Sequence, residues 1–424
     1  MADASAPVSG SSRPFGPLAF KAAFLCLLGF AVLNGWLIWM ERDPISRGYG
    51  DFASFYTAGK IVQQGQSARL YEPRLQWNVQ QEFASTVAIR KGPLPYIRPP
   101  FEALLFLPFA YLNYPAACVV WIALKAILLL SLPFLLPFES GARPVSPRAL
   151  EILLCFSFFP VGFDLIQGQD SILLLLIVVV GLRFLLRGAD LSAGAVLALG
   201  LFKFHLMIPF LAIFLLRKKG RVVLGFLVVA TLLLALSLAM VGWAGLAAYP
   251  RYLWSLNHWP GLGMVNPQGM PNVRGLMTIF LGNGPFPTPA HWFLAGVVVL
   301  GVIVAARFWR RDDRWSEMTG YSFAIVVVLA TSYYANSYDM TLLLLPLLLL
   351  GEAVLRDRGP AGWPRTLFLA ASAALLCTPL SWVLAIRIDQ YRWMALSLAA
   401  LAVSIFALEK IQHQENEIAR SQPV

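Results

Sequence analysis

The sequence predicts an all-α polytopic membrane protein with about 11 to 12 membrane-embedded helices, some of them re-entrant or broken. Of its 424 residues, 58% are hydrophobic and only 13% are charged. Its mean hydropathy is +0.68. Apolar stretches approaching the roughly 20 residues that a spanning helix needs recur from Leu18 to Leu408. This composition excludes a water-soluble enzyme.

The charged residues and the cysteines indicate which partners and cofactors to expect. Lys and Arg number 33 against 22 Asp and Glu, a net charge of +11, and in a membrane protein such an excess is typical of cytoplasmic loops. We therefore expect the lipid bilayer as a partner and no nucleic acid. The four cysteines stand singly in apolar runs, and no Gly-rich nucleotide loop or HExxH motif occurs. We expect no metal and no cofactor.

The charge pattern also predicts the domain organisation. Residues 1–17 are rich in Ser, Pro and Gly and are predicted to be a disordered cytoplasmic N-terminus. Residues 18–410 form one transmembrane domain, and residues 411–424 form a cytoplasmic tail. Two long loops, 41–98 and 242–290, are predicted to be extracytoplasmic. In the first loop apolar residues recur every three or four positions, as in helices that lie along an interface.

Two segments are too short for the number of crossings that the basic clusters require. If every cluster faces the cytoplasm, Leu191 to Leu216 must cross an even number of times. A re-entrant hairpin or a broken helix with GLFKFHLMIP at its turn satisfies this count, and one plain span is the alternative. By the same count PPFEALLFLPFAYL is a partial, re-entrant segment that precedes one true span. Such backbone is tolerated only where it lines protein or a wet cavity.

Ionisable groups inside apolar segments cost about 2.5 to 3.5 kcal/mol each at mid-helix, so each needs a partner or a function. All but one of these groups fall toward the predicted outer face. The exception, Lys125, has no obvious partner in the sequence. The others are Glu102, Asp164, Asp170, Lys203, His205 and Asp339.

Asp51 opens the amphipathic segment DFASFYTAGK and is the candidate general base. A carboxylate held at the membrane surface can take a proton from an incoming hydroxyl. The alternative is a helix N-cap, which Asp serves well. One residue can fill both roles.

Four basic side chains are candidates for binding a phosphate group. Lys203 and its neighbour His205 lie at the predicted hairpin turn, where snorkelling and a bond to a turn carbonyl are the respective alternatives. Arg98 and Arg274 offer forked donors that match a phosphate, or else contact lipid headgroups.

Sugar hydroxyls are bound by polar side chains and aromatic rings, and several occur in the outer segments. Gln169 and Asp170 stand at a helix start, where capping is the default role. Asp339 can cap a helix, pair with Lys203 or orient a substrate. The candidates for contact with a sugar or acceptor are Tyr56, Gln169, Asp170, Asn272, Tyr338 and Asp339.

The order of several motifs resembles glycosyltransferase family 87, membrane enzymes of the C superfamily that use polyprenyl-phosphate sugars. The motifs are GDFASFYTAGKIVQQG, LYEP, YIRPPFEALLFLPFAYL, GQDSILLLL, LSAGAVLALGLFKFH and SYYANSYDMTLLLLP. The resemblance implies the glycosyltransferase C fold and favours Asp51 as the base. Some mannosyl members carry paired histidines where this chain has Tyr338 and Asp339.

The resemblance further implies the reaction. A mannose or arabinofuranose-like sugar would pass from a polyprenyl-phosphate donor to a hydroxyl of a glycan or glycolipid, with inversion. The transfer reaction would take place on the periplasmic side of a bacterial inner membrane. A transporter or flippase of a lipid-linked sugar is the alternative, because broken helices and midplane ions also mark transport sites. A structural subunit is a third possibility, for which the buried ions would be needlessly costly.

Overall fold

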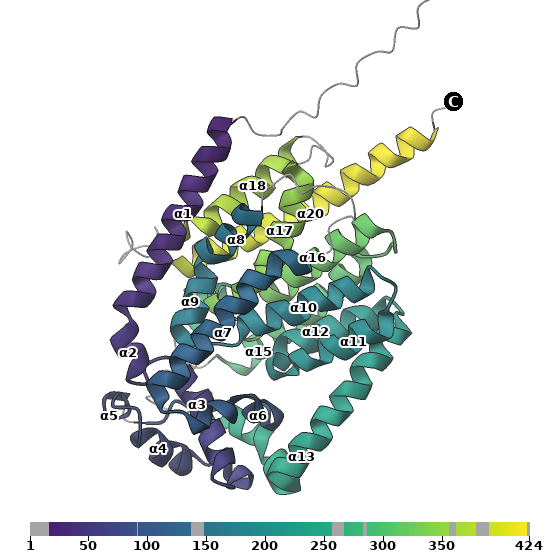
Figure 1. Ribbon diagram of the computed structural model, residues 1–424. Helices are drawn as coiled ribbons and strands as arrows, with labels where there is room; N and C mark the ends of the chain where they lie inside the picture. Colours follow the sequence, from purple (N-terminus) through teal and green to yellow (C-terminus); the bar gives the residue numbers. More distant parts are fainter. Residues whose placement is uncertain are drawn as a thin grey trace, which may run out of the picture.

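The structure is a computed structural model that describes residues 17–90, 92–136, 148–256, 267–282, 286–355, 362–378 and 390–421. These residues form helices and connecting turns without a strand (Figure 1). Within them, six helices are long and apolar enough to cross a membrane, and the helix pair Arg148–Ser157 and Phe159–Gln167, bent by 57°, makes up to seven. The prediction of an all-helical polytopic membrane protein is confirmed. The predicted disorder of residues 1–17 falls almost wholly outside the described residues.

The first described helix is α1 (Pro17–Met40), and a compact group of short helices follows it, here called the outer helices. Aromatic rings hold this group together, with Phe52 in contact with Phe106, Phe109 and Trp121. The predicted re-entrant segment forms three short helical turns of this group instead of one helix. The outer helices are α2 (Arg42–Ser46), α3 (Phe52–Gln63), η1 (Ser67–Arg69), α4 (Pro73–Gln81), α5 (Val87–Arg90), η2 (Pro100–Glu102), α6 (Ala103–Phe106) and η3 (Pro108–Tyr111).

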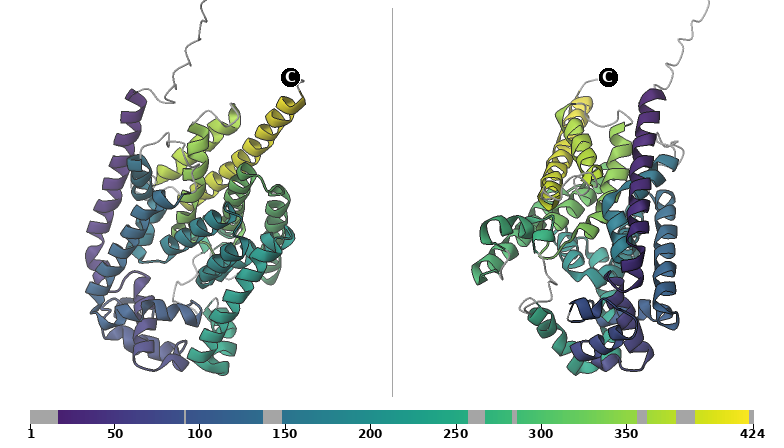
Figure 2. Two further views of the ribbon diagram at one scale, coloured as in Figure 1. Left: turned by 45° about the vertical axis from the view of Figure 1, so that its right-hand side comes forward. Right: turned by 90° about the vertical axis from the view of Figure 1, so that its left-hand side faces the viewer.

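The remaining helices form the membrane part and its connections. They are α7 (Tyr114–Leu135), α8 (Arg148–Ser157), α9 (Phe159–Gln167), α10 (Ser171–Leu185), α11 (Asp190–Ala198), η4 (Leu199–Lys203), α12 (Phe204–Leu216), α13 (Gly220–Leu256), η5 (Pro267–Gly269), α14 (Val273–Leu281), α15 (Thr288–Phe308), α16 (Arg314–Thr331), η6 (Ser337–Leu343), α17 (Leu344–Leu355), α18 (Trp363–Leu376) and α20 (Gln390–Ser421). The described start of α1 and the end of α20 lie on one side, opposite the outer helices (Figure 2).

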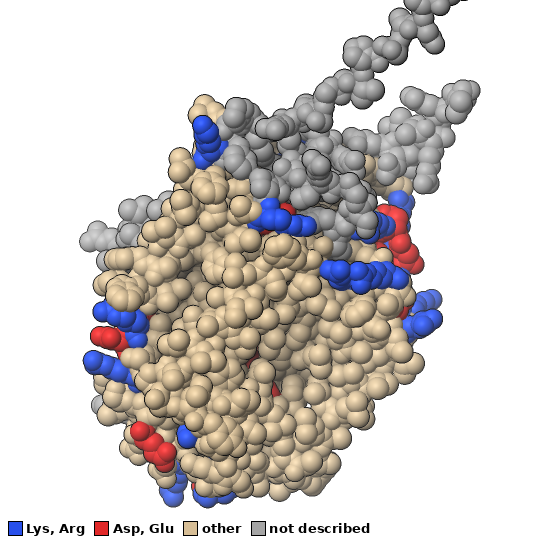
Figure 3. All heavy atoms as spheres, viewed as in Figure 1, with Lys and Arg blue, Asp and Glu red and all other residues tan. Residues whose placement is uncertain are grey.

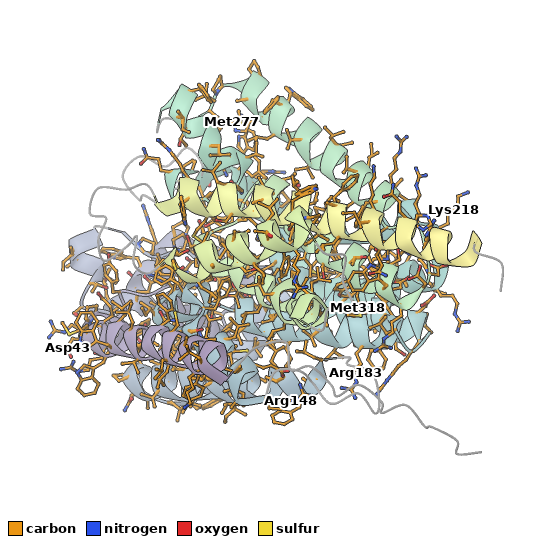
Figure 4. All side chains as sticks on the ribbon, turned by 90° about the horizontal axis from the view of Figure 1, so that it is seen from above. Asp43, Arg148, Arg183, Lys218, Met277 and Met318 are labelled. Atoms are coloured by element: carbon orange, nitrogen blue, oxygen red, sulfur yellow. The ribbon has the colours of Figure 1, made fainter. Side chains whose placement is uncertain are left out.

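Charged side chains mark the two borders of an apolar band. On the face in Figure 3, Lys, Arg, Asp and Glu gather toward two opposite margins, and the broad surface between them is uncharged except for a few acidic atoms in a hollow near its middle. Seen from above, Arg183 and Lys218 lie at the other end of the molecule from Asp43 (Figure 4). This is the pattern expected of a protein whose middle is embedded in a bilayer.

The first arm of the predicted hairpin runs beside α10. Asp190–Leu216 is long and apolar enough to cross a membrane as one helix, but η4 interrupts it and Lys203 leaves helical geometry (φ −108°, ψ 58°). Leu197 lies against Gly181. Lys203 then reaches Ser171, at the start of α10. The first arm therefore ends beside the first residue of α10.

The second arm returns toward the other end of α10. The ring of Phe210 lies 5.0 Å from that of Tyr321, and the Tyr321 hydroxyl donates to the carbonyl of Val178, in the middle of α10. A straight helix would have carried Phe210 beyond the start of α10 instead. These contacts support the predicted hairpin, with Lys203 at its turn, over the alternative of one plain span.

Helix α13 corrects the boundary predicted for the second outer loop. It continues to Leu256, across a break at Gly242, whose φ of 68° favours glycine. The part after the break packs against η1 and η2. Thus the first part of the predicted 242–290 loop is a helix docked on the outer helices. Residues 257–266 and 283–285 of this loop lie outside the described residues.

Helices α11 and α13 cross so closely that only glycine fits at the crossing. A Cβ atom on Gly194 would lie 1.9 Å from the carbonyl oxygen of Val222. We expect Gly194→Ala to lower the free energy of unfolding by about 1 to 3 kcal/mol, as overpacking does. Denaturant titration of the purified protein measures this. Gly296→Ala, in α15 with no atom near its Cβ position, is the control, and an equal loss in both variants would contradict the prediction.

Candidate active site

The candidate site forms around the turn between α9 and α10. Gly168 ends α9 in the left-handed conformation (φ 69°), and a Cβ atom there would lie 2.5 Å from that of Phe52. Its carbonyl accepts a hydrogen bond from the Trp121 indole at 2.9 Å. The turn is thereby held between α3 and α7, which places Gln169 and Asp170 beside the start of α3.

Asp51 is linked to this turn through a side-chain amide. The Gln169 amide nitrogen donates to Oδ2 of Asp51 at 2.5 Å. The amide oxygen of Gln169 accepts from Arg98 at 2.9 Å. Although Asp51 is the residue before α3, its side chain makes no capping hydrogen bond. The capping alternative is therefore not what the structure shows, and the Asp51 carboxylate faces the site.

A fully buried ion cluster lies behind Gln169. The Nζ atom of Lys203 lies 2.8 Å from Oδ1 of Asp170 and 2.5 Å from Oδ1 of Asp339. Arg98 reaches the same Oδ1 of Asp170 at 3.0 Å. Ser171 accepts from Lys203 as well. Buried charges persist only when paired, so this cluster binds α10, η6 and the hairpin turn to the outer helices.

Lys125, which had no evident partner in the sequence, pairs with Asp164. The distance from Lys125 Nζ to Asp164 Oδ1 is 2.9 Å, and neither side chain is exposed. Lys125 also donates to the carbonyl of Gln169 at 3.1 Å, while Oδ2 of Asp164 accepts from the Ser171 amide. This pair fixes the backbone of the turn that carries the site.

Two side chains at the edge of the site each keep a nitrogen without a hydrogen bond, although Nη1 of Arg274 donates to the carbonyl of Tyr333 at 3.1 Å. Nε of Arg274 and Nε2 of His205 are buried and lack a hydrogen bond. The Arg274 guanidinium stacks 4.1 Å from the ring centroid of Tyr333, and the His205 ring lies 5.6 Å from that of Tyr334. Both therefore approach the adjacent tyrosines between α16 and η6.

Tyr334, which sequence reasoning did not single out, contacts the His205 ring and also interacts with Asp51. Its hydroxyl and that of Tyr338 both accept from the amide of Asn336, at 3.2 and 2.6 Å. Both tyrosines are close enough to Asp51 to interact electrostatically with its carboxylate. The motif SYYANSYD could have indicated Tyr334, because it places three tyrosine rings directly before an apolar helix.

Of the residues predicted from the sequence, two lie outside this network. The Tyr56 hydroxyl donates to the carbonyl of Leu112 at 2.7 Å, within the outer helices. Asn272 caps α14 by accepting from the Gly275 amide and donates to the Ser332 carbonyl. The structure brings together Asp51, Arg98, Gln169, Asp170, Lys203, Tyr338 and Asp339, with His205 and Arg274 at the edge.

The surface is hollowed near the middle of the face shown in Figure 3, between the helices α10 to α12 and the outer helices, and acidic atoms are visible inside the hollow. In the outer helices, burial raises the pKa of Glu102 well above its usual range, and the charge of Asp170 adds to this effect. Against the opposing effect of burial, the charge of Asp170 raises the pKa of Arg98. The Arg98 guanidinium therefore stays charged.

The fold and this arrangement define a class: a polytopic membrane enzyme whose outer helices bring a carboxylate to a buried, cation-containing pocket. Glycosyltransferase family 87 matches residues 96–332, more than half of the chain, and the protein belongs to this family. It is thus a membrane glycosyltransferase, which confirms the resemblance and favours transfer over transport. Among curated proteins and among solved structures, no match is found.

Proposed function

We propose that the protein transfers a mannose or arabinofuranose-like sugar from a polyprenyl-phosphate donor to a hydroxyl group of a glycan or glycolipid. The carboxylate of Asp51, a half-buried side chain held by Gln169 at the border of the outer helices and the membrane part, is the observation that carries this proposal. The reaction would take place on the periplasmic side of a bacterial inner membrane.

The proposed step is an inverting displacement. Asp51 takes the proton of the acceptor hydroxyl as its oxygen bonds to the anomeric carbon. The bond between that carbon and the phosphate oxygen breaks, and its electron pair leaves with the phosphate. Fixed cations in a pocket of low dielectric stabilise that developing charge.

Arg274 and His205 are the proposed phosphate ligands. Each has an unpaired buried nitrogen, and a buried donor without an acceptor is costly unless a ligand supplies one. Lys203 and Arg98 already contact carboxylates at 3.0 Å or less. In this proposal Lys203 and Arg98 hold Asp170 and Asp339 in place and add positive potential. Direct contact with the phosphate, predicted from the sequence for all four basic residues, is then made mainly by Arg274 and His205.

The sugar itself would lie against the tyrosines of η6 and its approach. Tyr338 and Tyr334 offer hydroxyls within electrostatic reach of Asp51, and Gln169 joins Asp51 to Arg98 and Asp170. Aromatic faces and convergent polar groups are typical of sugar sites. Tyr56 and Asn272 would act on the substrate only through the packing of their neighbours.

A donor screen tests the function. Purified protein in proteoliposomes is given labelled mannosyl or arabinosyl polyprenyl phosphate and an acceptor with a free hydroxyl. We expect a labelled product of inverted anomeric configuration with one donor class. Label that crosses the membrane still attached to its lipid, without a new glycosidic bond, would instead support the flippase alternative.

We expect Arg274→Lys to raise the KM for the donor by about tenfold to a hundredfold, because Lys lacks the forked, stacked guanidinium. Initial rates against donor concentration measure this. Arg251→Lys, an exposed change in α13, is the matched control. An unchanged KM in Arg274→Lys would contradict the assignment of Arg274 to the phosphate.

A further inference from the structure

We propose that Glu102 and Asp170 share one proton, and that Glu102 is a positioning residue which holds Arg98 and, through Gln169, the carboxylate of Asp51. The inference deepens the proposed function and rests on it only for the role of Asp51. Its structural basis is the pair of buried carboxyl groups of Glu102 and Asp170. Neither the ion cluster nor the transfer step requires a negative charge on Glu102.

The first observation is a shortage of hydrogen-bond donors. Oε1 of Glu102 and Oδ2 of Asp170 are both buried and have no donor. The two carboxyl groups nevertheless lie against the same guanidinium, that of Arg98, at 3.9 and 3.0 Å, and interact with each other. Two ionised carboxylates cannot hydrogen-bond to each other, because both are acceptors only. A proton on Glu102 gives the pair its missing donor.

The second observation is the geometry of the neighbouring guanidinium. Arg98 lies 3.0 Å from Oδ1 of Asp170 but 3.9 Å from Oε2 of Glu102. The close, strong contact therefore goes to Asp170. Oε2 of Glu102 also accepts from the Tyr96 hydroxyl at 3.2 Å. This is the pattern expected of an ionised Asp170 next to a neutral Glu102.

The charges that face Glu102 from every side favour the same assignment. Glu102 faces Arg98 on its own segment and Asp170 at the start of α10. Asp170 in turn pairs with Lys203 at the hairpin turn, and Lys203 pairs with Asp339 on η6. The phenols of Tyr71, Tyr96 and Tyr249 surround the rest of Glu102. With Glu102 neutral, Asp170 and Asp339 balance Arg98 and Lys203 one for one. An ionised Glu102 would leave a surplus buried anion, which is costly.

The proton also bears on Asp51. Arg98 donates to Oδ1 of Asp170 and to the amide oxygen of Gln169, whose amide nitrogen holds Asp51. Ionised Glu102 would pull Arg98 away from Asp170 and loosen this chain. Because the folded state favours the protonated form, both stability and transfer should fall as the pH rises through the pKa of Glu102 in the folded protein.

Infrared difference spectroscopy of the purified protein tests the shared proton without any activity. We expect the carbonyl stretch of a protonated carboxyl group at pH 7, and its loss in Glu102→Gln but not in Glu82→Gln, an exposed control in the outer helices. Absence of that band in the wild type would overturn the proposal, even if transfer proceeds as proposed. A failed donor screen would leave this result unaffected.

Transfer assays test the positioning role. Glu102→Ala should lose about tenfold or more in rate, because Asp170 loses its donor, and Glu102→Gln should restore most of that loss because its amide still donates. The decline as the pH rises should be weaker in Glu102→Gln than in the wild type. An equal loss of rate in Glu102→Gln and Glu102→Ala would overturn the shared proton. A wild-type rate that a chelator abolishes and Mg²⁺ restores would do the same, in favour of a bound cation.

Discussion

Asp51→Asn is expected to lower the kcat of sugar transfer by about 10²- to 10⁴-fold, the usual contribution of a general base. Asn matches Asp in size and still offers an oxygen to the Gln169 amide, so the site should keep its shape. What Asn cannot do is accept a proton from the acceptor hydroxyl. The measurement is the initial rate of labelled-sugar transfer at saturating donor.

Asp43→Asn is the matched control, because it removes an exposed carboxylate from the same group of outer helices. Its rate should equal that of the wild type. Donor affinity should survive in both variants, since the base contacts the acceptor and not the phosphate. A rate in Asp51→Asn within a few-fold of the wild type would remove Asp51 from the mechanism.

Lys203→Met is expected to produce the largest loss of stability. It removes the cation that lies 2.8 and 2.5 Å from two buried carboxylates. Breaking a buried ion pair costs about 3 to 5 kcal/mol, because the remaining charge is uncompensated. Unfolding of the purified protein in mixed micelles, followed against denaturant concentration, measures the change.

A double variant separates charge from packing. Adding Asp339→Asn to Lys203→Met removes one of the uncompensated carboxylates, so part of the stability should return. Lys21→Met, at the exposed start of α1, controls for the substitution itself. Additive losses in the double variant would show that the ion pair contributes nothing beyond its separate side chains.

Apolar composition alone was sufficient for the fold class. A chain with this proportion of hydrophobic residues can satisfy its backbone in lipid only as helices. The count of crossings required by the basic clusters also located the break at Lys203, which the contacts of Leu197 and Phe210 support. That argument worked because it used a constraint on the whole chain instead of a local helical pattern.

Local patterns failed where tertiary contacts override them. Asp51 has the position of an N-cap but makes no capping hydrogen bond. Helix α13 continues beyond its break at Gly242 because this part packs against the outer helices. Lys125 had no visible partner because Asp164 is 39 positions away in the chain. No periodicity along one helix can reveal such a pairing.

The amino-acid sequence by itself determined that this protein lies in a membrane, that it is all helical and that its costly charges belong to a site. Only the tertiary structure decided which charges meet. It brought together Asp51, Arg98, Gln169, Asp170, Lys203 and Asp339 from five separate stretches, and it left nitrogens of Arg274 and His205 unpaired. The physical reason is that burial makes every charge costly, while the partner that offsets this cost is chosen by distance in space.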